Sequence, residues 1–191
     1  MNPEPESQQR STSAALDIPT LLRIHSQALD YTASLVEDLT DRQIHWRPSE
    51  HSSAIGWHLG HQAAVAHFMV RNLTAATPSL DPEMDQLMDS ATPEPDRGVL
   101  PPISQISDYR DKTTEHLRLG MRQIDAGDVG SPNQLQAIAR TLLVAVINHE
   151  FQHSTWIGEV RVEQHKKPMP PTPESPFLTS VDGYLMIKDS I

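Results

Sequence analysis

Four stretches of this chain carry apolar residues at helical intervals, and connections that contain proline or glycine separate them. They cover residues 17–40, 53–76, 103–125 and 133–164. Their apolar side chains recur three and four residues apart, which places them on one face of an α-helix. No alternating pattern is strong enough to require a sheet. Because amphipathic helices of this length bury their apolar faces against one another, the sequence predicts an all-α protein, a four-helix bundle.

The connection between the second and third stretches is much longer than the others. Residues 77–102 include six prolines, six acidic residues and one basic residue, Arg97. Prolines at this density interrupt helices and strands, so we expect a loop with one helical turn at residues 82–88. One long connection among shorter ones predicts a bundle with a crossover loop. This acidic loop either gates a site in the bundle or is a mobile, solvated connection.

The two ends of the chain differ from the helical body. Residues 1–15 are polar and contain prolines, so we expect a disordered N-terminal tail. Residues 16–166 form the predicted bundle domain. Residues 167–191 contain five prolines and show no clear period, which predicts a proline-rich C-terminal tail. With neither a signal-like segment nor an apolar run long enough to span a membrane, we expect a cytoplasmic protein.

The composition excludes several classes of partner and site. The 15 lysines and arginines and 25 acidic residues give a formal net charge of −10. A charge of this sign repels nucleic acid and anionic membrane surfaces, so neither is an expected partner. The chain has ten histidines and no cysteine, which excludes disulfides, thiolate metal sites and a cysteine nucleophile.

Two of the histidines stand four residues apart in the last predicted helix. His149 and His153 belong to the segment Asn-His-Glu-Phe-Gln-His at residues 148–153 and lie one turn apart on one face. Both continue an apolar stripe, since His149 follows Val146 by three residues and His153 precedes Trp156 by three. We expect both to point inward, where two neutral imidazoles can chelate a divalent metal ion.

The second predicted helix offers a third ligand. In the segment Gly-Trp-His-Leu-Gly-His at residues 56–61, His61 lies on the face that also carries Trp57 and Val65. Three inward histidines leave coordination positions open for water or substrate, as in catalytic metal sites. His58 is either a hydrogen-bond partner of a ligand, an alternative ligand or a helix-surface residue. The remaining histidines are expected at the surface or in connections: His25, His45, His51, His67, His116 and His165.

These two histidine segments, with Gly158 just beyond the second, resemble the DinB-like family of metal-binding four-helix bundles over about residues 17–165. The resemblance implies that His61, His149 and His153 hold a divalent metal, which is nickel, zinc or iron in that family. It also implies a reaction class. Characterised members are thiol S-transferases that use bacillithiol, mycothiol or glutathione, or catalysts of thiol-dependent isomerisation.

A competing motif overlaps the same helix. Residues 149–153 also fit the HExxH signature of zinc peptidases, in which the glutamate is the general base. The longer metzincin pattern is absent, because Trp156 and Glu159 stand where it requires glycine and histidine. Glu150 points about 100° away from His149 around the helix. Glu150 is a candidate catalytic base, although a solvated charge is the interpretation that we favour.

The sequence therefore predicts a divalent-metal-dependent enzyme that activates a low-molecular-weight thiol, or water, at a three-histidine site. Its expected partner is a small-molecule substrate, an electrophile onto which the thiol sulfur is transferred. One alternative is a non-enzymatic metal-binding stress or interaction protein that forms a homodimer. The other is a metal-dependent hydrolase of the HExxH type.

Overall fold

The computed structural model describes residues 16–73, 77–93, 97–130 and 132–188, which are mostly helical. The predicted tail at residues 1–15 lies outside this part of the chain. Four of the helices are long: α1 (Ile18–Ser34), α3 (Ile55–Leu73), α5 (Ile103–Ala126) and α6 (Pro132–Glu163). Two helices are short: α2 (Asp41–Ile44) and α4 (Pro82–Leu87). Two strands follow them: β1 (Leu178–Val181) and β2 (Tyr184–Ile187).

Local sequence explains where the long helices begin and end. Asp17 caps α1, because its carboxylate accepts a hydrogen bond of 2.8 Å from the backbone N–H of Thr20. Pro19 is tolerated in the first turn, where its missing N–H has no helical partner. α5 ends at Gly127, whose φ is 78°. Glycine adopts this left-handed conformation without steric cost, so the chain turns there toward α6.

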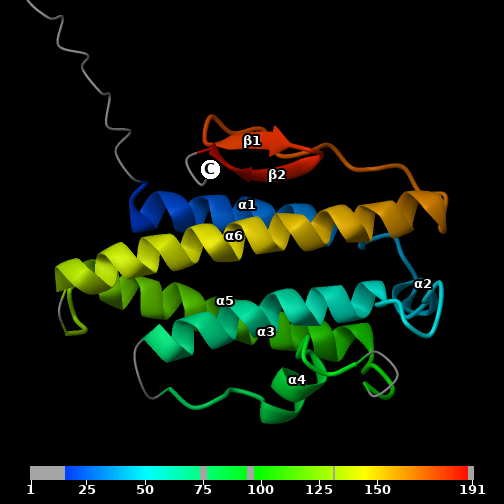
Figure 1. Cartoon of the computed structure of the whole chain (residues 1–191), viewed down its shortest axis with the longest axis horizontal. Helices are drawn as coiled ribbons and strands as arrows, with labels where there is room; N and C mark the ends of the chain where they lie inside the picture. The colour runs from blue at the N-terminus through cyan, green and yellow to red at the C-terminus, as the bar shows by residue number, and fades with distance from the viewer. Residues whose placement is uncertain (1–15, 74–76, 94–96, 131, 189–191) are drawn as a thin grey trace, which may run out of the picture.

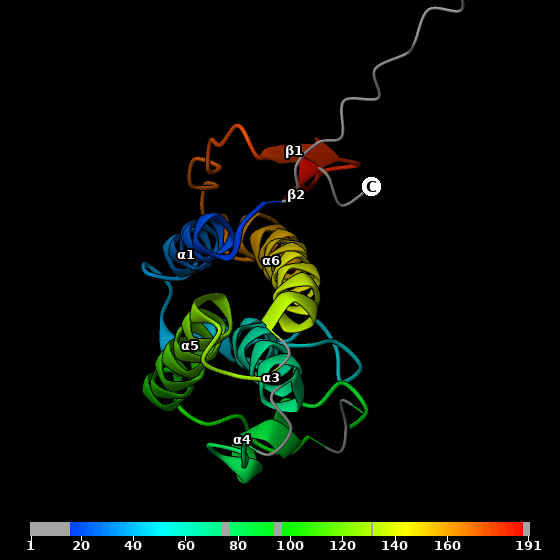
Figure 2. The same ribbon diagram turned by 90° about the vertical axis from the view of Figure 1, so that its left-hand side faces the viewer.

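The four long helices lie side by side, as the end-on view in Figure 2 shows. α6 packs against α1 and α3, and α5 contacts the other three. α3 runs antiparallel to α6, since His58 bonds to His153 while Gln62, one turn later, bonds to Glu150. α1 runs in the direction of α6, and α5 in that of α3 (Figure 1). Among the described residues, none of these helices has the length and apolar character that crossing a membrane needs.

Because α3 and α5 run in the same direction, the connection between them returns along the length of both (Figure 1). It contains α4, which confirms the helical turn predicted at residues 82–88. The interpretation as a mobile, solvated connection is wrong for α4 and its C-terminal cap, because Met84 and Met88 are only 2% and 0% exposed. Met88 fits against α3 at Gly60, where a Cβ would overlap the methionine side chain. The absence of a side chain at this position therefore permits the close approach.

The C-terminal segment contains a hairpin that the sequence analysis did not predict. β1 pairs antiparallel with β2. The turn residues Asp182 and Gly183 have φ values of 51° and 88°, as in the Asp-Gly turns that join short hairpins. β2 packs on α6, and the backbone N–H of Ile187 donates to Asn148 Oδ1 over 2.9 Å. The expectation that no part of the chain requires a sheet is therefore wrong for this part of the proline-rich tail at residues 167–191.

Two histidines that we expected at the surface are buried. His25 on α1 is 2% exposed and His67 on α3 is 0% exposed. His67 Nδ1 lies 3.3 Å from Asp85 Oδ1, and its ring meets the ring of His116 edge-on. Helical spacing shows which residues share a face, but whether that face is covered depends on neighbouring elements. Here α4 brings Asp85 to the side of α3 that carries His67.

Candidate metal centre

α3 and α6 bring the three predicted ligands together. One ring nitrogen from each of His61, His149 and His153 lies within 4.8 Å of the other two. His61 and His153 are 7% and 4% exposed, and His149 is partly buried. The spacing of four residues puts two of the rings on one face of α6, and the packing of α3 on that face supplies the third.

Hydrogen bonds hold two of these rings by one nitrogen each and leave the other nitrogen for a ligand. His61 Nδ1 donates to the carbonyl oxygen of Met88 over 2.7 Å. His153 Nδ1 lies 2.8 Å from His58 Nδ1, so one of these rings donates and the other accepts. In metal-bound imidazoles the nitrogen away from the metal makes such a bond, which fixes the tautomer. His58 is therefore a buried partner of His153 and not a helix-surface residue.

The surroundings of the cluster favour neutral imidazoles. Burial and the neighbouring imidazoles lower the pKa of His149 from 6.5 to about 4 and the pKa of His153 to about 2. Burial also lowers the pKa of His61. At pH 7 all three rings are uncharged, which is the form that binds metals. Three neutral imidazoles that each offer one ring nitrogen fit zinc, nickel or iron in the divalent state.

These lowered pKa values predict that the metal-free protein loses stability on mild acidification. In the unfolded chain the histidines titrate near pH 6.5, whereas His149 and His153 stay neutral in the folded protein at that pH. Below pH 6.5 the unfolded state binds more protons. Each such histidine then lowers the free energy of unfolding by about 1.4 kcal/mol per pH unit until its folded pKa is reached. Urea denaturation at several pH values below neutrality measures this slope.

Two variants distinguish the contribution of His149 and His153 to this pH dependence from the contribution of the rest of the chain. Alanine at His51, whose side chain is 75% exposed, is expected to leave the slope unchanged. Alanine at both His149 and His153 is expected to flatten it, because two of the groups that titrate only on unfolding are gone. An unchanged slope in the double variant would contradict the assignment of lowered pKa values to these two rings.

Trp57 forms one wall of the cluster. Its ring stacks on His61, with centroids 4.5 Å apart and planes inclined by 11°. The guanidinium carbon of Arg97 lies 3.8 Å from the centroid of the Trp57 ring. The connection between α3 and α5 thus adds two groups to the site, the Met88 carbonyl and the Arg97 cation. Sequence reasoning missed both, because no local pattern pairs a residue of a long loop with a particular turn of α3.

Glu150 is buried, which corrects its interpretation as a solvated charge. It is 3% exposed, and its Oε1 accepts hydrogen bonds of 2.6 Å from Thr32 and 2.8 Å from Arg110. Burial opposes ionisation of this carboxyl, but the Arg110 charge and the Thr32 hydroxyl outweigh it and keep the pKa of Glu150 below its ordinary value. The charged carboxylate therefore joins α6 to α1 and α5.

The hydrogen bonds of Glu150 bear directly on whether the HExxH signature marks a peptidase site. In zinc peptidases the glutamate is a general base beside the metal, and a base must lie within hydrogen-bond reach of the proton that it removes. Here the Glu150 carboxylate faces Thr32 on α1 and Arg110 on α5, whereas His149 and His153 face His61 on α3. The geometry gives no support to a peptidase.

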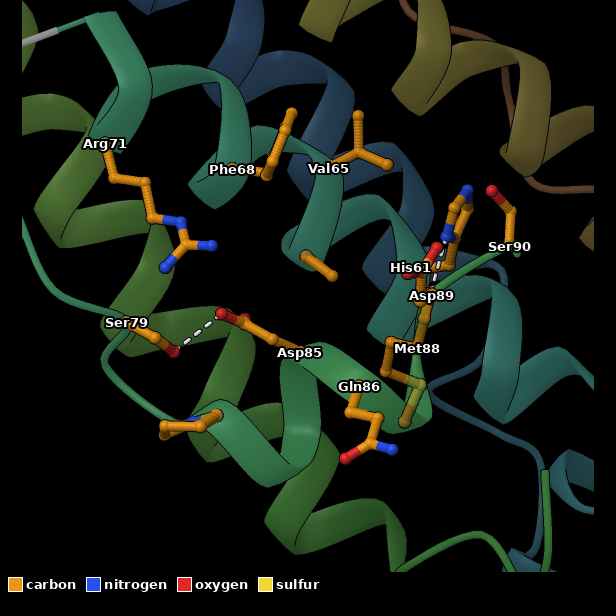
Figure 3. A pocket seen from close by; sticks show the side chains of 12 residues that line it. His61, Val65, Phe68, Arg71, Ser79, Asp85, Gln86, Met88, Asp89 and Ser90 are labelled. Carbon is orange, nitrogen blue, oxygen red and sulfur yellow. Dashed lines mark hydrogen bonds between the residues drawn. The ribbon is translucent and has the colours of Figure 1, made fainter. Parts of the chain in front are cut away.

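Two cavities border the histidine cluster. One, of about 610 Å³, lies between α3 and α4 and includes His61 (Figure 3). The other, of about 460 Å³, lies between α6 and the hairpin and includes His149. The hairpin absent from the sequence prediction thus forms one wall of the second cavity. The polar side chains around that cavity come from both elements: Asn148, Gln152, Asp182 and Tyr184.

Comparison with known proteins places the chain in a family. Residues 24–157 match the family model described as the DinB superfamily. The matched span holds all three clustered histidines, His58 and Glu150. No curated protein matches the chain. Because the family model covers well over half of the 191 residues, the chain belongs to the DinB superfamily.

Proposed function

We propose that this protein is a divalent-metal-dependent enzyme in which His61, His149 and His153 hold the ion and a low-molecular-weight thiol is the nucleophile. The observation that carries the proposal is the convergence of three neutral imidazoles beside two cavities. Three protein ligands are the usual number in catalytic metal sites, where the remaining positions take water or substrate. Membership of the DinB superfamily supports the same assignment.

Membership of the DinB superfamily also supports a finer description of the fold. We assign α1, α3, α5 and α6 to a DinB-like four-helix bundle over residues 16–166, with one long crossover loop between α3 and α5. In this arrangement α4 and its C-terminal cap hold the crossover loop against the site through Met88 and Gly60. The homodimer of the alternative interpretation and the cytoplasmic location stay predictions from the sequence.

The chain's own residues prepare the centre for a ligand. Met88 and His58 fix the rings of His61 and His153 through one nitrogen each, which leaves the other ring nitrogen for a metal. Trp57, which is 5% exposed, covers the cluster on one side and limits the access of bulk water there. Ligands therefore approach through the two cavities, one along His61 and the other along His149. Separate approaches suit a reaction with two substrates.

The proposed reaction transfers sulfur to an electrophilic carbon. The chain has no cysteine, so the sulfur has to come from a separate thiol. A divalent ion held by His61, His149 and His153 would lower the pKa of such a thiol and favour the more nucleophilic thiolate form. The thiol proton passes to water, a sulfur–carbon bond forms, and the leaving group departs with the electron pair of the bond that breaks.

An assay of thiol transfer tests the proposal. Protein loaded with nickel, zinc or iron is mixed with glutathione or bacillithiol and an activated aryl halide, and the thioether product is measured. We expect a rate that saturates with both substrates and falls to the uncatalysed value after chelation. Conversion of the aryl halide to the phenol, with release of halide in the absence of thiol, would show that water is the nucleophile and would support the hydrolase instead. Stoichiometric metal binding without any thiol transfer would support the non-enzymatic alternative.

A further inference from the structure

The cavity between α3 and α4 contains a cation that lacks an anionic partner among the described residues. Arg71 lies in the last turn of α3, and its side chain lines this cavity (Figure 3). Its guanidinium carbon lies 5.8 Å from the Phe68 ring centroid, while its Nε is buried without a hydrogen-bond partner. A basic residue near a helix C-terminus is favourable, but a buried donor left without an acceptor is costly. An anion in the cavity would pair with the charge of the guanidinium.

The two carboxylates that line the cavity do not take this role. Asp85 accepts a hydrogen bond of 2.6 Å from Ser79 and one of 2.5 Å from the hydroxyl of Tyr109. Figure 3 shows the first of these bonds below the Arg71 guanidinium, on the side of the cavity that carries α4. Asp89 lies at the opposite end, beside the histidine cluster. Among the described residues, no ion pair joins Arg71 to either carboxylate, and Arg71 is the basic residue at the end of the cavity away from the proposed metal.

The distance between the two ends limits the size of a ligand. Arg71 and His61 are ten residues apart on α3, which separates their backbones by about 15 Å. The arginine side chain extends into the cavity and shortens this span (Figure 3). A small inorganic anion or acetate is too short to join the two ends. An extended tripeptide spans up to about 10 Å, which is of the order of this shortened span.

We propose that Arg71 binds a carboxylate of the thiol substrate, and that this thiol is consequently an anionic molecule of about tripeptide size. The inference rests on the proposed function and narrows its substrate. Glutathione and bacillithiol carry free carboxylates, whereas mycothiol carries none, so the cavity selects the first two. Arginine suits this task because its planar fork forms two parallel hydrogen bonds with a carboxylate.

Binding of sulfur-blocked thiols tests the proposal without turnover. S-methylglutathione retains both carboxylates, and its diethyl ester has none. Calorimetric titration of the wild-type protein and of Arg71→Met is expected to show at least about tenfold weaker binding of the diacid by the variant. Binding of the diester should be the same for both proteins. Arg71→Lys should restore part of the affinity, because it keeps the charge but lacks the fork.

Matched controls keep the result specific to this position. Arg122 is exposed and pairs with Glu115 on the surface of α5, so Arg122→Met should bind the diacid like the wild type. Thermal melts of each variant establish that it is folded. Because the probe has no free thiol, its binding does not depend on thiolate formation. Arg71-dependent binding combined with a failed transfer assay would therefore count against the proposed function alone.

Three results would overturn the inference. The first is that Arg71→Met weakens the binding of the diacid and of the diester equally, or weakens neither. The second is failure of the wild-type protein to bind both S-methylglutathione and S-methylbacillithiol. The third is equal binding of these thioethers to both proteins together with Arg71-dependent binding of a carboxylated electrophile. That result would assign the carboxylate to the other substrate.

Discussion

Alanine at both His149 and His153 is expected to abolish metal-dependent stabilisation and thiol transfer while leaving a folded protein. These residues supply two of the three converging ligand atoms, and His61 alone is too weak a ligand to retain the ion. In the wild type, a metal at a hundred times its Kd raises the free energy of unfolding by about 2.7 kcal/mol. The variant should gain nothing. Transfer should fall by more than about 100-fold, since losing only the hydrogen-bond partners of ligands costs 10- to 100-fold.

Urea denaturation with and without added metal, alongside the transfer assay, measures both effects. Alanine at His51, which is exposed and lies outside the helices that carry the cluster, serves as the control and should behave as the wild type does. Metal stabilisation that survives in the double variant would contradict the three-histidine centre. An equal loss in the His51 variant would show that the effect is not specific to the cluster.

Glu150→Ala is expected to cause the largest loss of stability among the single substitutions considered. The Glu150 side chain is 3% exposed and the Arg110 side chain 13% exposed, with 2.8 Å between Oε1 and the guanidinium nitrogen. Removing one partner of a buried ion pair leaves an uncompensated charge, which costs about 3–5 kcal/mol. Thr32 also loses its hydrogen-bond acceptor. Equilibrium urea denaturation at neutral pH measures the difference from the wild type.

The exposed ion pair between Glu115 and Arg122 provides a matched control. Both side chains are more than half exposed, so Glu115→Ala should cost at most about 1 kcal/mol. A general base in an HExxH site would give the opposite pattern, in which Glu150→Ala abolishes turnover and leaves stability unchanged. A stability loss no greater than that of Glu115→Ala would contradict the structural role of Glu150.

The sequence predicted those parts of the structure that depend on local periodicity. The four long helices follow from apolar spacing, and the short α4 follows from the prolines around it. His149 and His153 were identified as a pair because a spacing of four residues fixes two rings on one face of a helix. Convergence with His61 additionally required helices α3 and α6 to be neighbours, which the predicted bundle allowed and the family resemblance implied.

Other parts depend on which segments meet in space. The ion pair between Glu150 and Arg110 forms because α5 covers one particular side of α6. The sequence of α6 does not show which side that is, because apolar residues occur around much of the helix. The bond from His61 to the Met88 carbonyl likewise joins α3 to a distant loop. The hairpin is different, since the Asp182-Gly183 turn was a local signal. Its strands are too short for their alternation to stand out.

Metal analysis of the purified wild-type protein tests the three-histidine centre most directly. Elemental analysis by mass spectrometry should find one nickel, zinc or iron ion per chain. The ion should leave on treatment with a chelator and return on addition of the metal. Protein that holds no stoichiometric divalent ion, and that takes up none of these three metals when they are added, would contradict the assignment of His61, His149 and His153 as a metal centre.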